Sequence, residues 1–134
     1  MELPSFNVQE GISNEQLVFR AFLRPNWFEV HGTETKATPV AFLRRRDRDP
    51  DGLSVGPTAE ACQAYLSIKM GFCKLVAGEI RRAGETREGG VSYGMDVVPD
   101  RIDHANIINV PHRHENPELA LAIASDLAKI ANEH

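Results

Sequence analysis

Apolar residues along the chain gather into short runs that are separated by turn-forming residues. The first run, Leu17–Leu23, is almost continuously apolar and ends at the turn-forming segment Arg24–Asn26. Runs of this length, bounded by Pro, Gly, Asn or Asp, are typical of β-strands. The same pattern predicts further short strands at residues 40–43, 53–55, 75–80, 95–98 and 105–110, with a Pro99-Asp100 turn between the last two.

A helical pattern begins in the middle of the chain. Thr58 is a favourable N-cap residue, and apolar side chains recur at helical spacing after it, at Ala61, Tyr65 and Ile68. We therefore expect a mid-chain helix from Thr58 to about Met70.

The C-terminal helix has the clearest start signal. Asn116 is a favourable N-cap and Pro117 stands at the first helical position, where a missing backbone N–H costs nothing. The predicted buried stripe of this helix consists of Leu119, Ile123, Leu127 and Ile130.

These elements predict an α+β fold: a small mixed or antiparallel sheet of short strands, with a mid-chain helix and a C-terminal helix. Strict β–α–β alternation is missing, which argues against a parallel sheet. A length of 134 residues is ordinary for one domain. We expect a single domain over residues 1–134, with residues 1–16 as an arm or loop and the glycine-rich residues 84–94 as a flexible excursion.

Charge and composition limit the classes of function. The chain has 15 Lys and Arg against 19 Asp and Glu, a net charge of −4, which argues against sequence-independent nucleic-acid binding. The run Arg44–Asp51 holds four arginines and three aspartates without interleaved aromatic residues. Mixed signs of this kind are typical of a solvated loop, although a basic contact to nucleic acid is the alternative interpretation.

The two cysteines show no disulfide or Cys-x-x-Cys spacing, so we expect Cys62 and Cys73 to be core residues in a reducing compartment. The first residues, MELPSFNVQEG, lack the basic start and apolar run of a signal peptide. No segment approaches the roughly 20 apolar residues of a membrane span. We expect a cytoplasmic protein that does not enter the membrane.

Arg20 is the most informative polar residue because it interrupts an apolar run. A buried guanidinium must be satisfied, since an isolated charge in a core is too costly. One interpretation is structural: Arg20 pairs with an acid such as Asp51 or Asp96, or faces water. The other is functional: its planar fork of N–H donors binds a phosphate or carboxylate in a cleft.

Two further segments supply candidate ligand-binding residues. Asp51 and Gly52 form a turn and Ser54 follows it in a short strand. Ser54 is either a strand residue or a hydrogen-bond donor to a ligand, because the Gly-x-Ser-x-Gly pattern of a nucleophilic serine is missing. His104 follows Asp103 at the start of a predicted strand, where it is either a tie between loop and sheet or a base whose tautomer an aspartate fixes.

His112 and His114 stand two residues apart, next to Glu115, in the segment between the last strand and the C-terminal helix. Two histidines with this spacing share a face on an extended chain, as metal ligands do. The intervening Arg113 opposes a cation, and no helical zinc signature is present. We expect a solvated loop and no metal site.

Five segments together carry a resemblance. Their order is FR at 19–20, VAF at 40–42, DGLSV at 51–55, VVPD at 97–100 and HAxI at 104–107. In this order the chain resembles a loose group of small uncharacterised bacterial proteins, over about residues 17–110. That group has no established activity, so the resemblance implies no function.

The chain is also similar to ADP-ribosyltransferase-like folds in Arg20 and Ser54. In those folds a first-strand arginine and a histidine or serine contact NAD, so this resemblance implies NAD as a ligand. The chain departs from the family pattern because none of its glutamates matches the catalytic glutamate. Glu79, in a predicted strand, is the nearest choice.

Two functions follow as predictions. The first is a non-catalytic binding or accessory module that acts through a protein partner or a second copy of the chain, since no complete catalytic constellation is visible and no cofactor is then needed. The alternative is a small nucleotide-handling enzyme directed at NAD, in which Arg20 binds an anion and Ser54 or His104 positions a sugar. The candidate ligand-binding residues are Arg20, Asp51, Ser54 and His104.

Overall fold

The structure, a computed structural model, describes residues 4–44, 51–83 and 94–134. The strands are β1 (Leu17–Ala21), β2 (Phe28–His31), β3 (Glu34–Ala37), β4 (Leu53–Val55), β5 (Phe72–Val76), β6 (Asp96–Arg101) and β7 (His104–Ile108). The α-helices are α1 (Ala59–Gln63), α2 (Ala77–Ala83) and α3 (Pro117–Asn132), and short 3-10 turns occupy Pro25–Trp27 and Pro39–Phe42.

All the strand pairs found in the described residues are antiparallel, and the predicted α+β class is confirmed. Strand β1 pairs with β5, β2 pairs with β3, and β7 lies between β4 and β6. Phe19 and Gly56 exchange two backbone hydrogen bonds of 2.8 Å. This bridge joins β1 to the end of β4, so the β1–β5 pair and the three-stranded sheet continue into one another.

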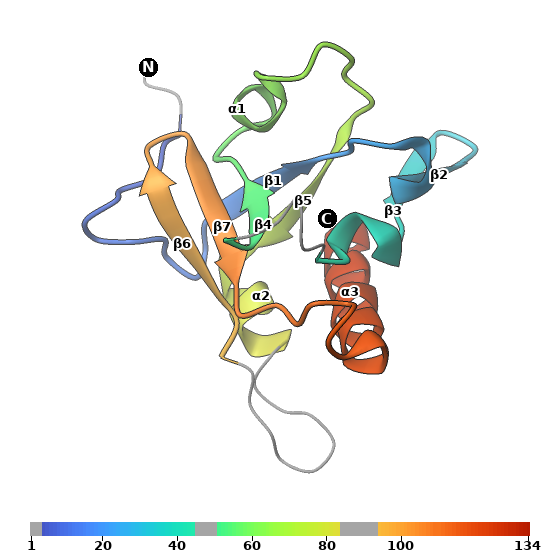
Figure 1. The fold of residues 1–134 in the computed structure, drawn as a ribbon. Helices are drawn as coiled ribbons and strands as arrows, with labels where there is room; N and C mark the ends of the chain where they lie inside the picture. Colours follow the sequence, from blue (N-terminus) through green and yellow to red (C-terminus); the bar gives the residue numbers. More distant parts are fainter. Residues whose placement is uncertain (1–3, 45–50, 84–93) are drawn as a thin grey trace.

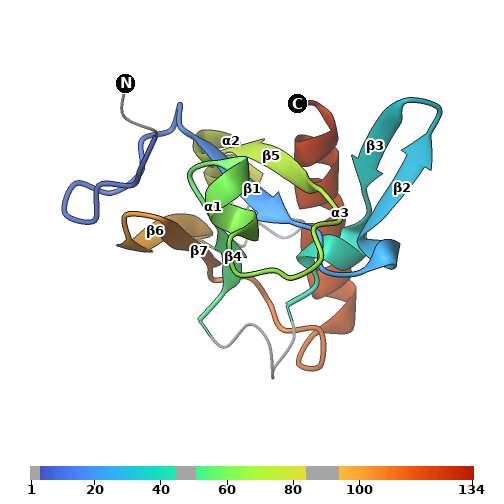
Figure 2. The same cartoon turned by 90° about the horizontal axis from the view of Figure 1, so that it is seen from above.

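Figures 1 and 2 place the β6–β7 hairpin on one side of the molecule and α3 on the other, with β1 and β5 between them. Helix α3 begins as predicted, because the side chain of Asn116 accepts a hydrogen bond from the backbone N–H of Leu119 at 3.2 Å. Its buried face carries Ile123 and Leu127 together with four alanines, which let the helix lie close to the strands. Leu119 and Ile130, the ends of the predicted stripe, are only partly buried.

The strand predicted at Val40–Leu43 is wrong. Pro39 begins a 3-10 turn there, and Ala41 and Phe42 are both fully buried. Consecutive residues of a strand point to opposite faces, whereas a tight helical turn allows Ala41 and Phe42 to point into the same core. The β2–β3 hairpin before it, with Gly32 at a positive φ in its turn, lies in a stretch where the sequence predicted no strand.

The mid-chain helix is shorter than predicted. The cap is correct, since the hydroxyl of Thr58 accepts from the N–H of Ala61 at 3.0 Å, but α1 ends at Gln63. Tyr65 and Ile68 are 66% and 69% exposed, so the second half of the expected stripe is not buried in the core. Helical spacing alone did not stabilise those turns.

The predicted strand at residues 75–80 is half right. Strand β5 covers Phe72–Val76, and α2 starts at once with Ala77. The apolar run continues through Ile80 because the strand and the helix each bury one face in the core. Leu75 is buried from the strand and Ile80 from the helix. Continuous apolarity does not separate a buried strand from a buried helix.

The hairpin between β6 and β7 turns later than predicted. Pro99 and Asp100 lie inside β6, and the turn falls at Ile102 and Asp103. Strand β6 is at the edge of the β4–β7–β6 sheet. At an edge, the missing backbone N–H of Pro99 does not interrupt the hydrogen bonds between strands. The strand therefore ends at Arg101, three residues beyond the predicted end at Val98.

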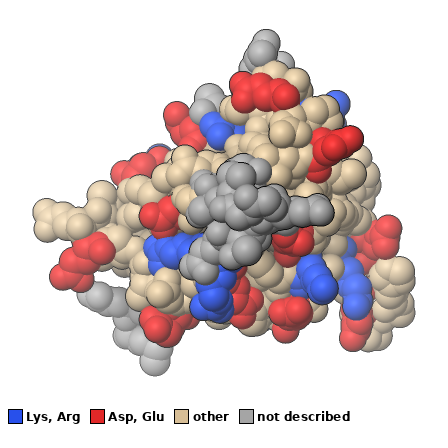
Figure 3. All heavy atoms as spheres, turned by 90° about the horizontal axis from the view of Figure 1, so that it is seen from below, with Lys and Arg blue, Asp and Glu red and all other residues tan. Residues whose placement is uncertain are grey.

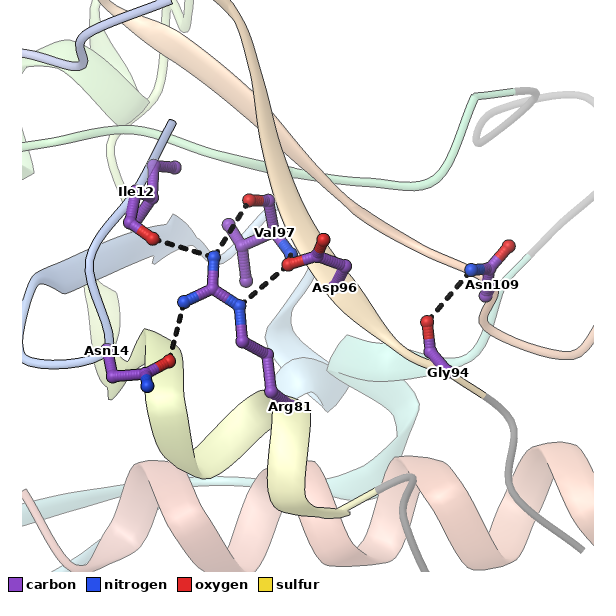
Figure 4. A network of polar contacts seen from close by, with 7 residues as sticks. All are labelled: Ile12, Asn14, Arg81, Gly94, Asp96, Val97 and Asn109. Atoms are coloured by element: carbon purple, nitrogen blue, oxygen red, sulfur yellow. Dashed lines mark hydrogen bonds and ion pairs between the residues drawn. The ribbon is translucent and has the colours of Figure 1, made fainter. Parts of the chain in front are cut away.

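The segment before β1, predicted as an arm or loop, contains no helix or strand in residues 4–16, but it is anchored. Phe6 and Ile12 are buried in the core. The guanidinium of Arg81 on α2 donates to the carbonyl oxygen of Ile12, the side-chain oxygen of Asn14 and the carboxylate of Asp96, each at 2.7 Å (Figure 4). One side chain thus ties the N-terminal segment, α2 and β6 together.

Candidate functional site

Three of the four residues chosen from the sequence line one cavity. Arg20 from β1, Ser54 from β4 and His104 from β7 all contribute to a cavity of about 490 Å³. Ligand sites commonly have volumes of roughly 300–1,000 Å³. Asp51 is exposed and does not line this cavity. The strand order explains the convergence, because β4 lies next to β7 and is bridged to β1.

Arg20 is 4% exposed and forms part of the cavity wall. Its Nε donates to the carbonyl oxygen of Ala41 at 2.7 Å and its Nη1 to the carbonyl oxygen of Ser54 at 2.9 Å. The guanidinium carbon lies 5.0 Å from the ring centre of Trp27 and 5.8 Å from that of Phe42. The expectation that Arg20 faces water is wrong, and Asp96, one of the acids considered for it, forms an ion pair with Arg81.

Ser54, His104 and Asp100 form a chain of side-chain hydrogen bonds. Nε2 of His104 lies 3.2 Å from Oγ of Ser54, and Nδ1 lies 2.6 Å from Oδ1 of Asp100. At neutral pH a carboxylate only accepts, so Nδ1 donates to Asp100. Nε2 of the neutral ring is then an acceptor, and the hydroxyl of Ser54 donates to it.

A bulge in the β6–β7 hairpin positions the aspartate. Pro99 pairs with Ala105 and Arg101 pairs with His104, so that Asp100 and Arg101 of β6 oppose one residue of β7. Such a bulge re-aims side chains at the end of a ladder. Here it leaves Asp100 across from His104, within hydrogen-bonding distance of the imidazole. Sequence reasoning assigned this role to Asp103, which instead lies 3.5 Å from Nε of Arg101.

Charged and aromatic side chains form an exposed part of the cavity lining. Tyr65, Arg101 and Asp103 line the cavity, and the side chains of Arg101 and Asp103 are 67% and 64% exposed. Tyr65 follows the end of α1 and is largely exposed. Tyr65, which the sequence placed on the buried stripe of the mid-chain helix, instead lines the cavity.

The indole N–H of Trp27 is a buried donor that has no acceptor among the described residues. Trp27 lines the cavity and its ring lies against the guanidinium of Arg20. A buried N–H without an acceptor costs free energy, about 1–3 kcal/mol. This unsatisfied donor therefore belongs to a residue of the cavity wall.

Cys62 also lines the cavity, and Cys73 lies opposite Arg20 on β5. Both are free and buried. Burial raises the pKa of the Cys62 thiol to about 11 and that of the Cys73 thiol to about 12. Nucleophilic cysteines need the thiolate, so neither thiol is activated at neutral pH.

These raised pKa values predict an alkaline loss of stability. The thiols ionise near 9.0 when the chain unfolds but only near 11 and 12 when it is folded. Their contribution is complete below pH 9 and falls as pH rises toward 11–12. In urea unfolding, the stability of the wild type relative to the Cys62→Ala/Cys73→Ala variant should decrease between pH 8 and pH 11. A difference that stays constant with pH would contradict buried thiols.

The segment with His112 and His114 is tied back to Arg44. The two imidazole ring centres are 5.0 Å apart, and His112 forms a parallel bridge with Arg44. Within the described residues, no group of three or more His, Cys, Asp or Glu side chains is arranged to hold a metal ion. Of the arginine-rich run, residues 45–50 lie outside the described residues. On the face seen from below, acidic and basic side chains are interspersed (Figure 3).

Sequence reasoning missed Asp100, Tyr65, Arg101 and Trp27 as residues of this site. Asp100 had a usable signal, since it stands four residues before His104 with a hairpin between them. The other three come together only through the fold.

Comparison with known proteins gives no match: no protein-family model, curated protein or solved structure matches the chain. In the part of the chain that is described, none of the helices has the length and apolar character needed to cross a membrane.

Proposed function

We propose that the cavity binds a nucleotide, and that NAD or a related dinucleotide is its ligand. The observation that carries the proposal is the convergence of Arg20, Ser54 and His104 on one cavity of about 490 Å³. The resemblance of Arg20 and Ser54 to the NAD-contacting residues of ADP-ribosyltransferase-like folds points to the same ligand.

The chemistry around the cavity suits the parts of a nucleotide. Arg101 and the guanidinium of Arg20 add positive charge near a phosphate, against one lining carboxylate from Asp103. The exposed ring of Tyr65 offers a face on which a base can stack. The Ser54–His104 pair offers a donor and acceptor to a sugar hydroxyl.

Thermal shift and calorimetry with NAD, ADP-ribose and adenosine test this proposal. A ligand at 100 times its dissociation constant stabilises the folded state by about 2.7 kcal/mol. We expect ADP-ribose and NAD to raise the melting temperature and adenosine, which has no phosphate, to raise it least. Arg101→Ala removes an exposed cation and should weaken ADP-ribose binding roughly ten-fold, about 1.4 kcal/mol.

Arg113→Ala is the matched control, because Arg113 is also exposed but does not line the cavity. It should bind ADP-ribose as the wild type does. The proposal fails if no nucleotide shifts the melting temperature, or if Arg101→Ala and Arg113→Ala weaken binding equally.

A non-catalytic module that acts through a protein partner, or through a second copy of the chain, is the second candidate function. The exposed apolar side chains of Tyr65 and Ile68, in the segment between α1 and β5, favour it. If the partner is a second copy of the chain, light scattering should show an oligomer, and Ile68→Ser should lower its mass. A nucleotide site alone predicts no change. For either candidate we propose a cytoplasmic location and no role in binding nucleic acid.

A further inference from the structure

The Ser54–His104–Asp100 chain has a geometry that nucleotide binding alone does not require. A serine is a weak nucleophile unless a base within about 2.6–3.2 Å takes its proton, and that base works best when a third group orients it. Here the Oγ–Nε2 distance is 3.2 Å and the Nδ1–Oδ1 distance is 2.6 Å. The roles of nucleophile, base and orienting acid are therefore filled by three neighbouring residues that line or border the cavity.

The strands hold the serine rigidly. Leu53 and Val55 on either side of Ser54 are 0% and 2% exposed, which fixes β4 in the core. Ser54 lies between them, is only partly buried and lines the cavity. The imidazole is fixed as well, because His104 lies in the β7 ladder and its ring is held between Ser54 and Asp100. Nucleophile and base are thus preorganised on strands and not on a loop.

A fixed positive charge lies beside the serine. Nη1 of Arg20 donates to the main-chain oxygen of Ser54 at 2.9 Å, and Nε is held by Ala41. When an oxygen nucleophile adds to a carbonyl, negative charge develops on the carbonyl oxygen, and a preorganised cation in a water-poor site stabilises it. The other potential nucleophile of the cavity, Cys62, is held as a thiol by its raised pKa of about 11.

We propose that Ser54 is a catalytic nucleophile that cleaves a small carboxylic ester in this cavity. Oγ of Ser54 adds to the ester carbonyl while Nε2 of His104 takes the hydroxyl proton. The tetrahedral intermediate collapses, the bond to the alkoxy oxygen breaks, and His104 gives its proton to the departing alcohol. Water then adds to the acyl-serine with the help of His104, releasing the carboxylic acid and restoring the hydroxyl of Ser54.

Asp100 is a positioning residue in this reaction. It holds the imidazole in the tautomer that has Nε2 unprotonated and stabilises the imidazolium that forms. The inference goes beyond the proposed nucleotide site, because ester cleavage by Ser54 needs no nucleotide and is tested independently of nucleotide binding.

A fluorophosphonate probe tests the proposal directly on the full chain. Oγ of an activated serine displaces fluoride from phosphorus, giving a stable phosphonyl adduct that intact-mass and peptide mass spectrometry locate. We expect one adduct, on Ser54, and none on Ser54→Ala. Ser67→Ala, which removes an exposed serine that does not line the cavity, should label at the wild-type rate.

Asp100→Asn keeps the test decisive if Ser54→Ala does not fold, because Asp100 is half exposed and the replacement has the same shape. We expect it to slow labelling at least 100-fold while the melting temperature stays within a few degrees. Hydrolysis of p-nitrophenyl acetate should fall in parallel. An adduct on another serine, no adduct on the folded wild type, or wild-type labelling of Asp100→Asn would overturn the proposal. Nucleotide binding without an adduct would contradict the proposed ester cleavage but not the proposed nucleotide binding.

Discussion

Arg20→Ala is expected to lower the melting temperature by about 10 °C. The guanidinium satisfies the carbonyl oxygens of Ala41 and Ser54, and each buried acceptor left without a donor costs roughly 1–3 kcal/mol. Loss of the contacts with the rings of Trp27 and Phe42 adds to this. A total near 3 kcal/mol corresponds to about 10 °C in a domain of this size. Differential scanning calorimetry measures it.

Arg24→Ala is the control, since Arg24 is exposed and lies just beyond β1. Its loss should change stability by no more than about 0.5 kcal/mol, as for most surface substitutions. A melting temperature for Arg20→Ala within 2 °C of the wild type would contradict a structural role for the guanidinium. If the large drop is found, Arg20→Ala cannot serve as a clean binding variant, which is why Arg101 carries that test.

Gly52→Ala is expected to destabilise the chain by roughly 3 kcal/mol and to disturb the site. Gly52 has a φ of +133°, a conformation that alanine adopts only with strain of about 1–3 kcal/mol. A Cβ there would also collide with the carbonyl oxygen of Ile107 on β7. Because the added Cβ meets main-chain atoms of Ile107, which cannot rotate away, β4 must move away from β7, and the contact from Ser54 to His104 opens with it. Urea unfolding measures the stability, and nucleotide binding should weaken in the same variant.

The glycine of the β2–β3 turn offers the comparison for this prediction. Gly32 also has a positive φ, of +65°, but nothing lies within 4 Å of a Cβ built on it. Gly32→Ala should therefore cost only about 1 kcal/mol of conformational strain. Equal losses in the two variants would mean that the contact between Gly52 and β7 has no energetic weight.

The fold was predictable wherever a local signal had a chemical cause. The caps at Thr58 and Asn116, the strand around Arg20 and the short strand Leu53–Val55 are each determined by residues next to them in sequence. These predictions did not depend on which elements pack against one another in the fold.

Elsewhere packing decided the outcome. The segment at Val40 is a 3-10 turn because Ala41 and Phe42 are buried together. The helix from Thr58 ends at Gln63, and Tyr65 and Ile68, which the helical spacing placed on its buried stripe, are largely exposed. Apolar periodicity says which residues favour burial, but not whether the fold provides a surface for them.

The residues of the candidate site likewise include some that the sequence revealed and some that it did not. Arg20 was identifiable because a charge inside an apolar run has to be satisfied, and Ser54 and His104 because each is a polar residue beside a turn or strand end. Asp51 was grouped with them through its nearness to Ser54 in sequence, and the structure leaves it exposed and outside the cavity. The partner of His104 depends on a bulge of one residue, which no alternation pattern reveals.

Arg20, Ser54 and His104 should respond to one ligand in one cavity, and an NMR titration with ADP-ribose measures this. We predict that the Nε–H of Arg20, the indole N–H of Trp27 and the ring of His104 shift together and give one dissociation constant. Shifts limited to the distant groove between α2 and α3, at residues such as Arg82 and Lys129, or no shifts at millimolar ligand, would contradict it.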